Sequence, residues 1–167
     1  MTRRAWLCSL SSLVLPAQTT LTEEQRSQFL EQPFEKDFGS TTEEIVGVLG
    51  QPLERKTAPR KNLHMPGQLD EIITLIYPGL EFAVYRTRPA DGSSMELHLR
   101  TALLDNRFKV KFGLGIGASL DTVRRRLGKP AQEQPGLLIY EANDFQSVAF
   151  THRNGLVSRV ERRTTPD

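Results

Sequence analysis

Two stretches of the chain carry apolar residues at the spacing of one helix face, and each stretch ends in the same Leu-Gly-x-Pro motif. Ser40-Thr41 and Ser119 precede the stretches, and hydroxyl side chains at such positions cap helix starts. Glycine followed by proline ends a helix, because glycine adopts the closing left-handed conformation and proline cannot continue. We therefore expect two short helices that end at Leu49 and Leu127. Their apolar stripes are Ile45, Val48 and Leu49 in the first helix and Leu120, Val123 and Leu127 in the second.

After each predicted helix the hydrophobic period changes to two, which is typical of half-buried strands. Asp91-Gly92 and Asn154-Gly155 accept positive φ and indicate hairpin turns at corresponding positions. Residues 107–112 also alternate cleanly and predict a further strand with one buried and one wet face. The other expected strands are residues 71–77, 81–86, 95–100, 137–140, 145–150 and 156–161.

The chain also matches itself in two blocks. At one offset, the residues that lead into Leu49-Gly50-Gln51-Pro52 match those that lead into Leu127-Gly128-Lys129-Pro130, and at an offset fifteen residues shorter the strand residues match. This pattern predicts an α+β fold, a tandem repeat of one helix plus a small antiparallel sheet with the helices packed on one face of the sheet. The expected divisions are an export signal at residues 1–17, an N-terminal helical segment at 18–37, a first repeat at 38–112 and a second repeat at 113–167.

Two tandem copies of a helix that ends in Leu-Gly-x-Pro before a small sheet resemble the fold shared by β-lactamase inhibitory protein and the SmpA/OmlA family of envelope lipoproteins. The resemblance covers about residues 38–162 and implies that the protein binds other proteins, as an inhibitor or an assembly accessory, and is not an enzyme. Fold-level likeness does not identify the partner. The positions that carry the resemblance are Gly39, Ile45, Leu49, Gly50, Pro52, Gly117, Val123, Leu127, Gly128, Pro130, Tyr140, Phe150 and Gly155.

The first seventeen residues read as an export signal. Arg3 and Arg4 precede an apolar run at residues 5–15 that is too short to span a bilayer permanently, and Pro16-Ala17 offers a small residue for cleavage. The general secretory route and a twin-arginine route both stay open. Cys8, the single cysteine, lies in this signal, so we expect a periplasmic or secreted chain without a disulfide, a thiolate site or a permanent membrane anchor.

Composition and motifs point away from catalysis and nucleic-acid binding. The formal net charge is only +2, which argues against an indiscriminate nucleic-acid binder. The glycines of residues 113–117 lack the spacing of a dinucleotide-binding loop. His64, His98 and His152 have no close partner in sequence that would indicate a metal site, and His98 is expected on the surface. We therefore expect no catalytic residue, no metal and no cofactor.

Two sets of residues are candidates for recognition. The first is the sheet face turned away from the helices, where aromatic and arginine side chains on rigid strands make good interface anchors. Its expected members are Tyr85, Glu96, His98, Arg100, Lys109 and Lys111. The second set is basic and supports an alternative function, the binding of an anionic envelope ligand such as a glycan or lipid head group. It combines a loop expected between Pro52 and Tyr77 with the second helix, through Arg55, Lys56, Arg60, Lys61, Arg124, Arg125 and Arg126.

Overall fold

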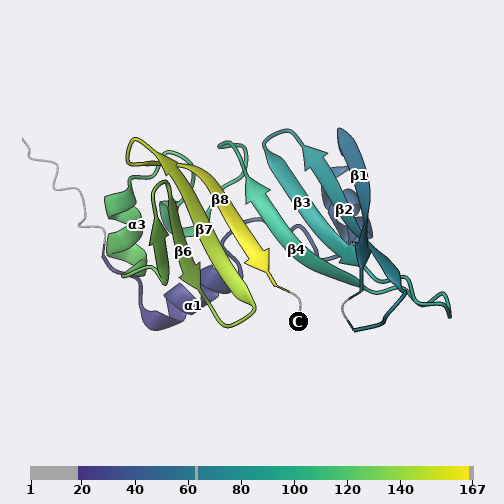
Figure 1. The fold of residues 1–167 in the computed structure, drawn as a ribbon. Coiled ribbons are helices and arrows are strands. Elements are labelled where there is room, and N and C mark those ends of the chain that lie inside the picture. Colours follow the sequence, from purple (N-terminus) through teal and green to yellow (C-terminus); the bar gives the residue numbers. More distant parts are fainter. Residues whose placement is uncertain (1–18, 63, 166–167) are drawn as a thin grey trace, which may run out of the picture.

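The computed structural model describes residues 19–62 and 64–165, and the predicted export signal at residues 1–17 lies outside them. Within the described residues the chain forms one antiparallel sheet of eight strands in the order β1-β2-β3-β4-β8-β7-β6-β5 (Figure 1). The antiparallel sheet predicted from the alternating pattern is thus confirmed. The strands are β1 (Glu54–Lys61), β2 (Leu69–Tyr77), β3 (Leu80–Arg86), β4 (Glu96–Leu103), β5 (Gln132–Gln134), β6 (Leu137–Glu141), β7 (Gln146–Arg153) and β8 (Leu156–Thr164).

Three α-helices begin at side-chain caps in the described part of the chain: α1 (Glu23–Glu31), α2 (Thr42–Leu49) and α3 (Leu120–Leu127). The Thr41 hydroxyl accepts a hydrogen bond from the Glu44 backbone N–H, and Ser119 does the same for Thr122. Gly50 and Gly128 end α2 and α3 at φ of 79° and 78°, a conformation that glycine adopts without a steric cost. The helix ends predicted from Leu-Gly-x-Pro are therefore confirmed.

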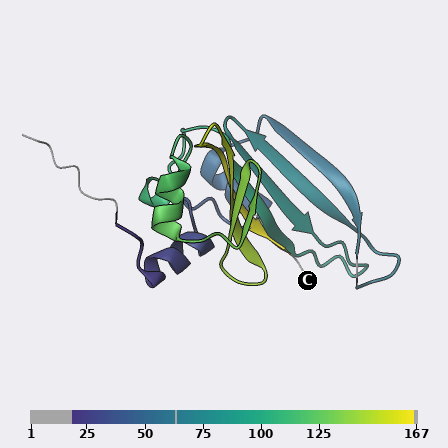
Figure 2. The same cartoon turned by 60° about the vertical axis from the view of Figure 1, so that its left-hand side comes forward.

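The helices pack on one face of the sheet, and the hydrophobic core lies between the helices and this face. Phe29 of α1 stacks on Phe150 of β7, with ring centroids 6.2 Å apart. The Tyr140 hydroxyl of β6 donates to the carbonyl oxygen of Gly128 at 3.2 Å, and the Tyr77 hydroxyl of β2 donates to that of Gly50 at 2.9 Å. Figure 2 shows α1 and α3 beside each other on this side. We call the opposite face, which no described helix covers, the open face.

The predicted tandem repeat of one helix plus a small antiparallel sheet is wrong, because the strands form one continuous eight-stranded sheet with three short helices. The joint is the pairing of β4 with β8, which places Arg100 opposite Arg163 and Leu103 opposite Val160. Two separate small sheets would each leave a long edge with unpaired N–H and C=O groups, and pairing β4 with β8 removes both edges. Local sequence patterns do not reveal which edges pair.

Two local predictions are also wrong. The region expected to be a loop between Pro52 and Tyr77 contains strand β1, which pairs with β2 along its whole length. Residues 107–112 form no strand of the sheet. There the Lys111 N–H donates to the Pro33 carbonyl oxygen at 2.8 Å, and Lys111 is the first residue of a short 3₁₀ helix, η1 (Lys111–Gly113). Of its apolar residues, Phe108 and Val110 contact Phe38 and Phe34 in the connection between α1 and α2, and Phe112 packs against Phe29 of α1.

Asp70, at the start of β2, ties the β1–β2 connection to the sheet. This carboxylate is fully buried and accepts hydrogen bonds from Asn62 (2.7 Å), Gln68 (2.7 Å), the Arg88 backbone N–H (2.9 Å) and the Tyr85 hydroxyl. Burial opposes its charge, but these hydrogen bonds outweigh burial and lower the pKa of Asp70 to about 2. The carboxylate therefore stays ionised and anchors the turn at all ordinary pH values.

Candidate functional site

Strand alternation assigns each side chain of the sheet to the helix-covered face or the open face. Leu103 and Val160 pair across the β4–β8 joint and belong to the core, so their neighbours Ala102 and Glu161 belong to the open face. Arg100 and Arg163 pair two positions further along and also lie on the open face. The open face thus carries charged side chains directly over the line where β4 meets β8.

These charges form a connected group, which we call the arginine–glutamate cluster. Its members are Glu81 of β3, Arg100 of β4, and Arg159, Glu161 and Arg163 of β8. Glu161 is 5% exposed; Arg159 binds one of its carboxylate oxygens at 2.6 Å, and Arg163 binds the other. Arg100 and Arg159 lie 3.5 and 3.7 Å from the Glu81 carboxylate. Three guanidinium groups are therefore held at fixed positions by two carboxylates.

The charge of Glu161 is stabilised by its arginines. Burial opposes ionisation, but the hydrogen bonds and positive charges of Arg163 and Arg159 outweigh burial and hold the pKa of Glu161 below its ordinary value. The three arginine side chains keep 29–42% of their surface in solvent. Part of each arginine side chain is thus accessible to a partner, while the ion pairs restrict its rotamers.

Apolar side chains flank the cluster. Leu97 of β4 lies on the open face opposite Tyr85 and is 39% exposed. Phe145, in the β6–β7 turn, is 46% exposed and borders a shallow pocket of about 310 Å³ that Ile139, Ser147 and Arg163 also line. A rigid arginine group with exposed apolar neighbours has the composition of the central part of a protein interface.

The structure does not bring the expected row of six recognition residues together. Tyr85 and Arg100 lie on the open face, and the Tyr85 hydroxyl is engaged by Asp70. Glu96 and His98 lie on the helix-covered face, and Lys109 and Lys111 lie outside the sheet, in the connection from β4 to α3. The expectation of one outward row on the sheet is therefore wrong.

His98 is buried, which contradicts the prediction of a surface histidine. It is 9% exposed, and its Nε2 lies 2.8 Å from the Thr101 hydroxyl oxygen and 3.0 Å from the Arg100 carbonyl oxygen. Burial, and then the positive charge of Arg162, lower the pKa of His98. A β-bulge in β4 explains the burial: Ala83 of β3 pairs with Arg100 and the next residue, Val84, pairs with His98, so Leu99 is an extra residue of β4. His98 and Arg100 therefore lie on different faces although they are two residues apart.

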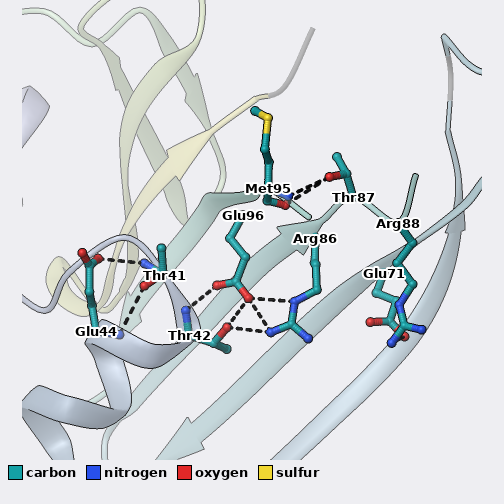
Figure 3. A network of polar contacts seen from close by, with 9 residues as sticks. All are labelled: Thr41, Thr42, Glu44, Glu71, Arg86, Thr87, Arg88, Met95 and Glu96. Atoms are coloured by element: carbon teal, nitrogen blue, oxygen red, sulfur yellow. Dashed lines mark hydrogen bonds and ion pairs between the residues drawn. The ribbon is translucent and has the colours of Figure 1, made fainter. Parts of the chain in front are cut away.

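Glu96 of β4 connects the start of helix α2 to the sheet through hydrogen bonds (Figure 3). Its carboxylate accepts hydrogen bonds from the Thr42 backbone N–H at 2.5 Å and from the Thr42 hydroxyl, and Arg86 forms an ion pair with it. A carboxylate at a helix N-terminus is stabilised by the unsatisfied N–H groups there. Hydrogen bonds from Thr42 and the charge of Arg86 outweigh the opposing effect of burial and lower the pKa of Glu96. This carboxylate therefore fastens α2 to the sheet.

The basic residues of the alternative function lie at opposite ends of the molecule. Arg55, Lys56, Arg60 and Lys61 belong to β1, the first strand of the sheet, whereas Arg124, Arg125 and Arg126 belong to α3, beside β6 (Figure 1). Arg124 pairs with Glu133 at 2.5 Å, and Arg126 donates to the Phe112 carbonyl oxygen at 2.8 Å. The two basic sets therefore do not form one binding surface.

Sequence reasoning missed Glu81, Arg159, Glu161 and Arg163. The sequence does contain a signal for three of them: Arg159, Glu161 and Arg163 stand at every second position of a strand and must therefore share a face. The partner strand that completes the cluster carries no such signal. The importance of these residues follows from the β4–β8 pairing.

Comparison with known proteins gave no matching protein family and no match among the curated proteins or the solved structures. The described residues contain no group of three or more His, Cys, Asp or Glu side chains that could hold a metal ion. No helix in the described ranges has the length and apolar character needed to cross a membrane.

Proposed function

We propose that the protein is a non-enzymatic binding module of the cell envelope that docks onto another protein through the open face of its sheet. The observation that carries this proposal is the arginine–glutamate cluster on the helix-free face, flanked by Leu97 and Phe145. Export to the periplasm or beyond rests on the sequence of residues 1–17.

The cluster suits recognition because its arginines are ordered before a partner arrives. Arg159 and Arg163 are both paired with Glu161, and Arg100 is paired with Glu81. Ordering a long side chain on binding costs about 0.5–1.5 kcal/mol, and pre-ordered side chains avoid much of this cost. Arginine and aromatic residues are also the types that most often dominate interface energies.

The side chains that could suggest catalysis have structural partners. Both oxygens of the Glu96 carboxylate bond to Thr42, and one of them also accepts hydrogen bonds from Arg86. The Nε2 of His98 lies within hydrogen-bond distance of both the Thr101 hydroxyl and the Arg100 carbonyl oxygen. These contacts support our inference that the protein works by binding. The anionic-ligand alternative stays a prediction and would rest on the four basic residues of β1 alone.

Phe145→Asp should weaken binding to the partner by about tenfold or more, because it places a carboxylate beside the exposed pocket and removes an aromatic anchor. Affinity purification from envelope extract with chain lacking residues 1–17, followed by titration of the recovered protein, measures the effect. Val48→Asp is the matched control, since Val48 is 43% exposed on α2 and Phe145 is 46% exposed. Equal affinity of both variants for the partner, or a loss of affinity confined to Val48→Asp, would contradict the proposal.

A further inference from the structure

The free edge of the sheet at β1 differs from the edge at the other end. β5 has three residues, whereas β1 has eight, and every residue of β1 is exposed. In the described part of the chain, no strand pairs with β1 on the side away from β2. Short edge strands protect a sheet against further pairing, and a long exposed edge is a template for another strand.

The ladder with β2 shows which backbone groups of β1 point outward. The Asn62 N–H donates to the Gln68 carbonyl oxygen at 3.0 Å, and Arg60 pairs with Asp70 in the same register. In an antiparallel ladder, residues bond to the partner strand at every second position. Since Asn62 bonds to Gln68, which directly precedes β2, the backbone N–H and C=O groups of the even-numbered residues of β1 point toward β2. The outward backbone groups therefore belong to Arg55, Thr57, Pro59 and Lys61.

The position of Pro59 agrees with this assignment. Proline has no N–H to donate, so inside a sheet it is tolerated on an edge strand where the missing donor would face away from the neighbour. Pro59 is at one of the outward positions of β1. The outward edge thus offers the N–H groups of Arg55, Thr57 and Lys61, together with the carbonyl oxygens of all four outward residues.

The charge of β1 selects the kind of strand that can be added. The strand carries one carboxylate, Glu54, which pairs with Lys56 at 3.2 Å. Its basic residues are Arg55, Lys56, Arg60 and Lys61. A second copy of β1 would bring two sets of like charges together, and lysine on an edge discourages such self-pairing. The same charges attract an extended segment that carries carboxylates. Arg55 also lines a half-open depression of about 520 Å³, which Glu43 and Glu96 line too, so this depression suits an uncharged side chain of that segment.

We propose that β1 accepts an acidic, extended segment of a partner protein as a ninth strand of the sheet. Main-chain hydrogen bonds to Arg55, Thr57 and Lys61 would give the affinity, and the four basic side chains would select acidic sequences. The inference rests on the proposed protein-binding function but concerns a second surface. Its test uses β1 and leaves the open face unchanged.

The probe is a fluorescent eight-residue peptide, the length of β1, that alternates glutamate and valine. Wild-type protein should bind this peptide and should not bind the counterpart with lysine in place of glutamate. N-methylation of two consecutive central residues blocks both edges of the peptide and should weaken binding by about tenfold or more. Fluorescence anisotropy measures all three affinities.

Thr57→Pro removes an outward donor of β1 without removing a hydrogen bond to β2, and should weaken binding of the acidic peptide by about tenfold or more. Thr57→Val keeps the strand and should bind as wild type does. Thermal unfolding checks that Thr57→Pro is folded; if it is not, the N-methylated peptide decides the question with wild-type protein.

Several outcomes would overturn the inference: no binding of the acidic peptide, equal binding of its N-methylated form, or self-association of the protein through β1 in sedimentation. Phe145→Asp separates this inference from the proposed function. The variant should bind the peptide like wild type, even if it loses the partner at the open face.

Discussion

Replacing Phe150 with alanine should lower the free energy of unfolding by about 3–5 kcal/mol, the usual cost of removing a fully buried aromatic ring. Phe150 is 0% exposed at the centre of β7. Its ring stacks on Phe29 of α1 and meets the edge of Tyr140 at 5.9 Å. The substitution therefore leaves a cavity where α1, β6 and β7 meet, and rigid strands cannot collapse into it. Chemical denaturation followed by circular dichroism measures the change.

Phe145→Ala serves as the control, because it deletes the same ring from an exposed turn five residues earlier. Its cost should stay within about 0.5 kcal/mol, as is usual for surface positions. Equal costs for the two variants would contradict the packing of α1 against the sheet. A large cost for Phe145→Ala alone would mean that Phe145, and not Phe150, is packed in the core.

Replacing Glu161 with glutamine should lower the free energy of unfolding by about 1–3 kcal/mol at neutral pH, because Arg159 and Arg163 lose the charged, buried acceptor that both of them bind. Breaking a fully buried ion pair costs about 3–5 kcal/mol. Here the arginine side chains are 29% and 42% exposed, and solvent reduces the loss. Glu133→Gln is the control, since that carboxylate pairs with Arg124 at 53% side-chain exposure and should contribute little.

Wild type and Glu161→Gln should also differ in how their stability depends on pH. The pKa of Glu161 is lower in the folded chain than its ordinary value of 4.5. Its contribution to stability is therefore complete above pH 4.5 and is lost as the pH falls through the folded value. Wild type should lose more stability than Glu161→Gln on acidification through this range. Parallel stability curves for the two proteins would show that the arginines do not stabilise the ionised carboxylate.

Elements with a local cause could be predicted from the sequence. The ends of α2 and α3 follow from Thr41, Ser119, Gly50 and Gly128, whose caps and closing conformations involve neighbouring residues only. Most strands follow from their alternating burial. Strand β1 could not be predicted in this way, because all eight of its residues are exposed and no apolar alternation marks it. It forms because the buried strand β2 offers it a complete ladder.

The architecture and the site depend on contacts between distant residues. Arg100 and Arg163 become neighbours only through the pairing of β4 with β8, and no local propensity encodes that choice. The bulge of β4 at Leu99, next to His98, likewise reverses a face that simple alternation had assigned, since one extra residue exchanges inside and outside. The predicted sheet face therefore existed, but four of its six expected members lie elsewhere.

Site-specific photo-crosslinking tests the central claim, binding of a protein at the open face, most directly. A photoreactive phenylalanine analogue placed at Phe145 or at Leu97 should yield a covalent adduct of one defined mass with the partner. The same analogue at Val48, on α2 and equally exposed, should yield none. Adducts from Val48 with none from Phe145 and Leu97, or equal adducts from all three positions, would contradict an interface on the open face.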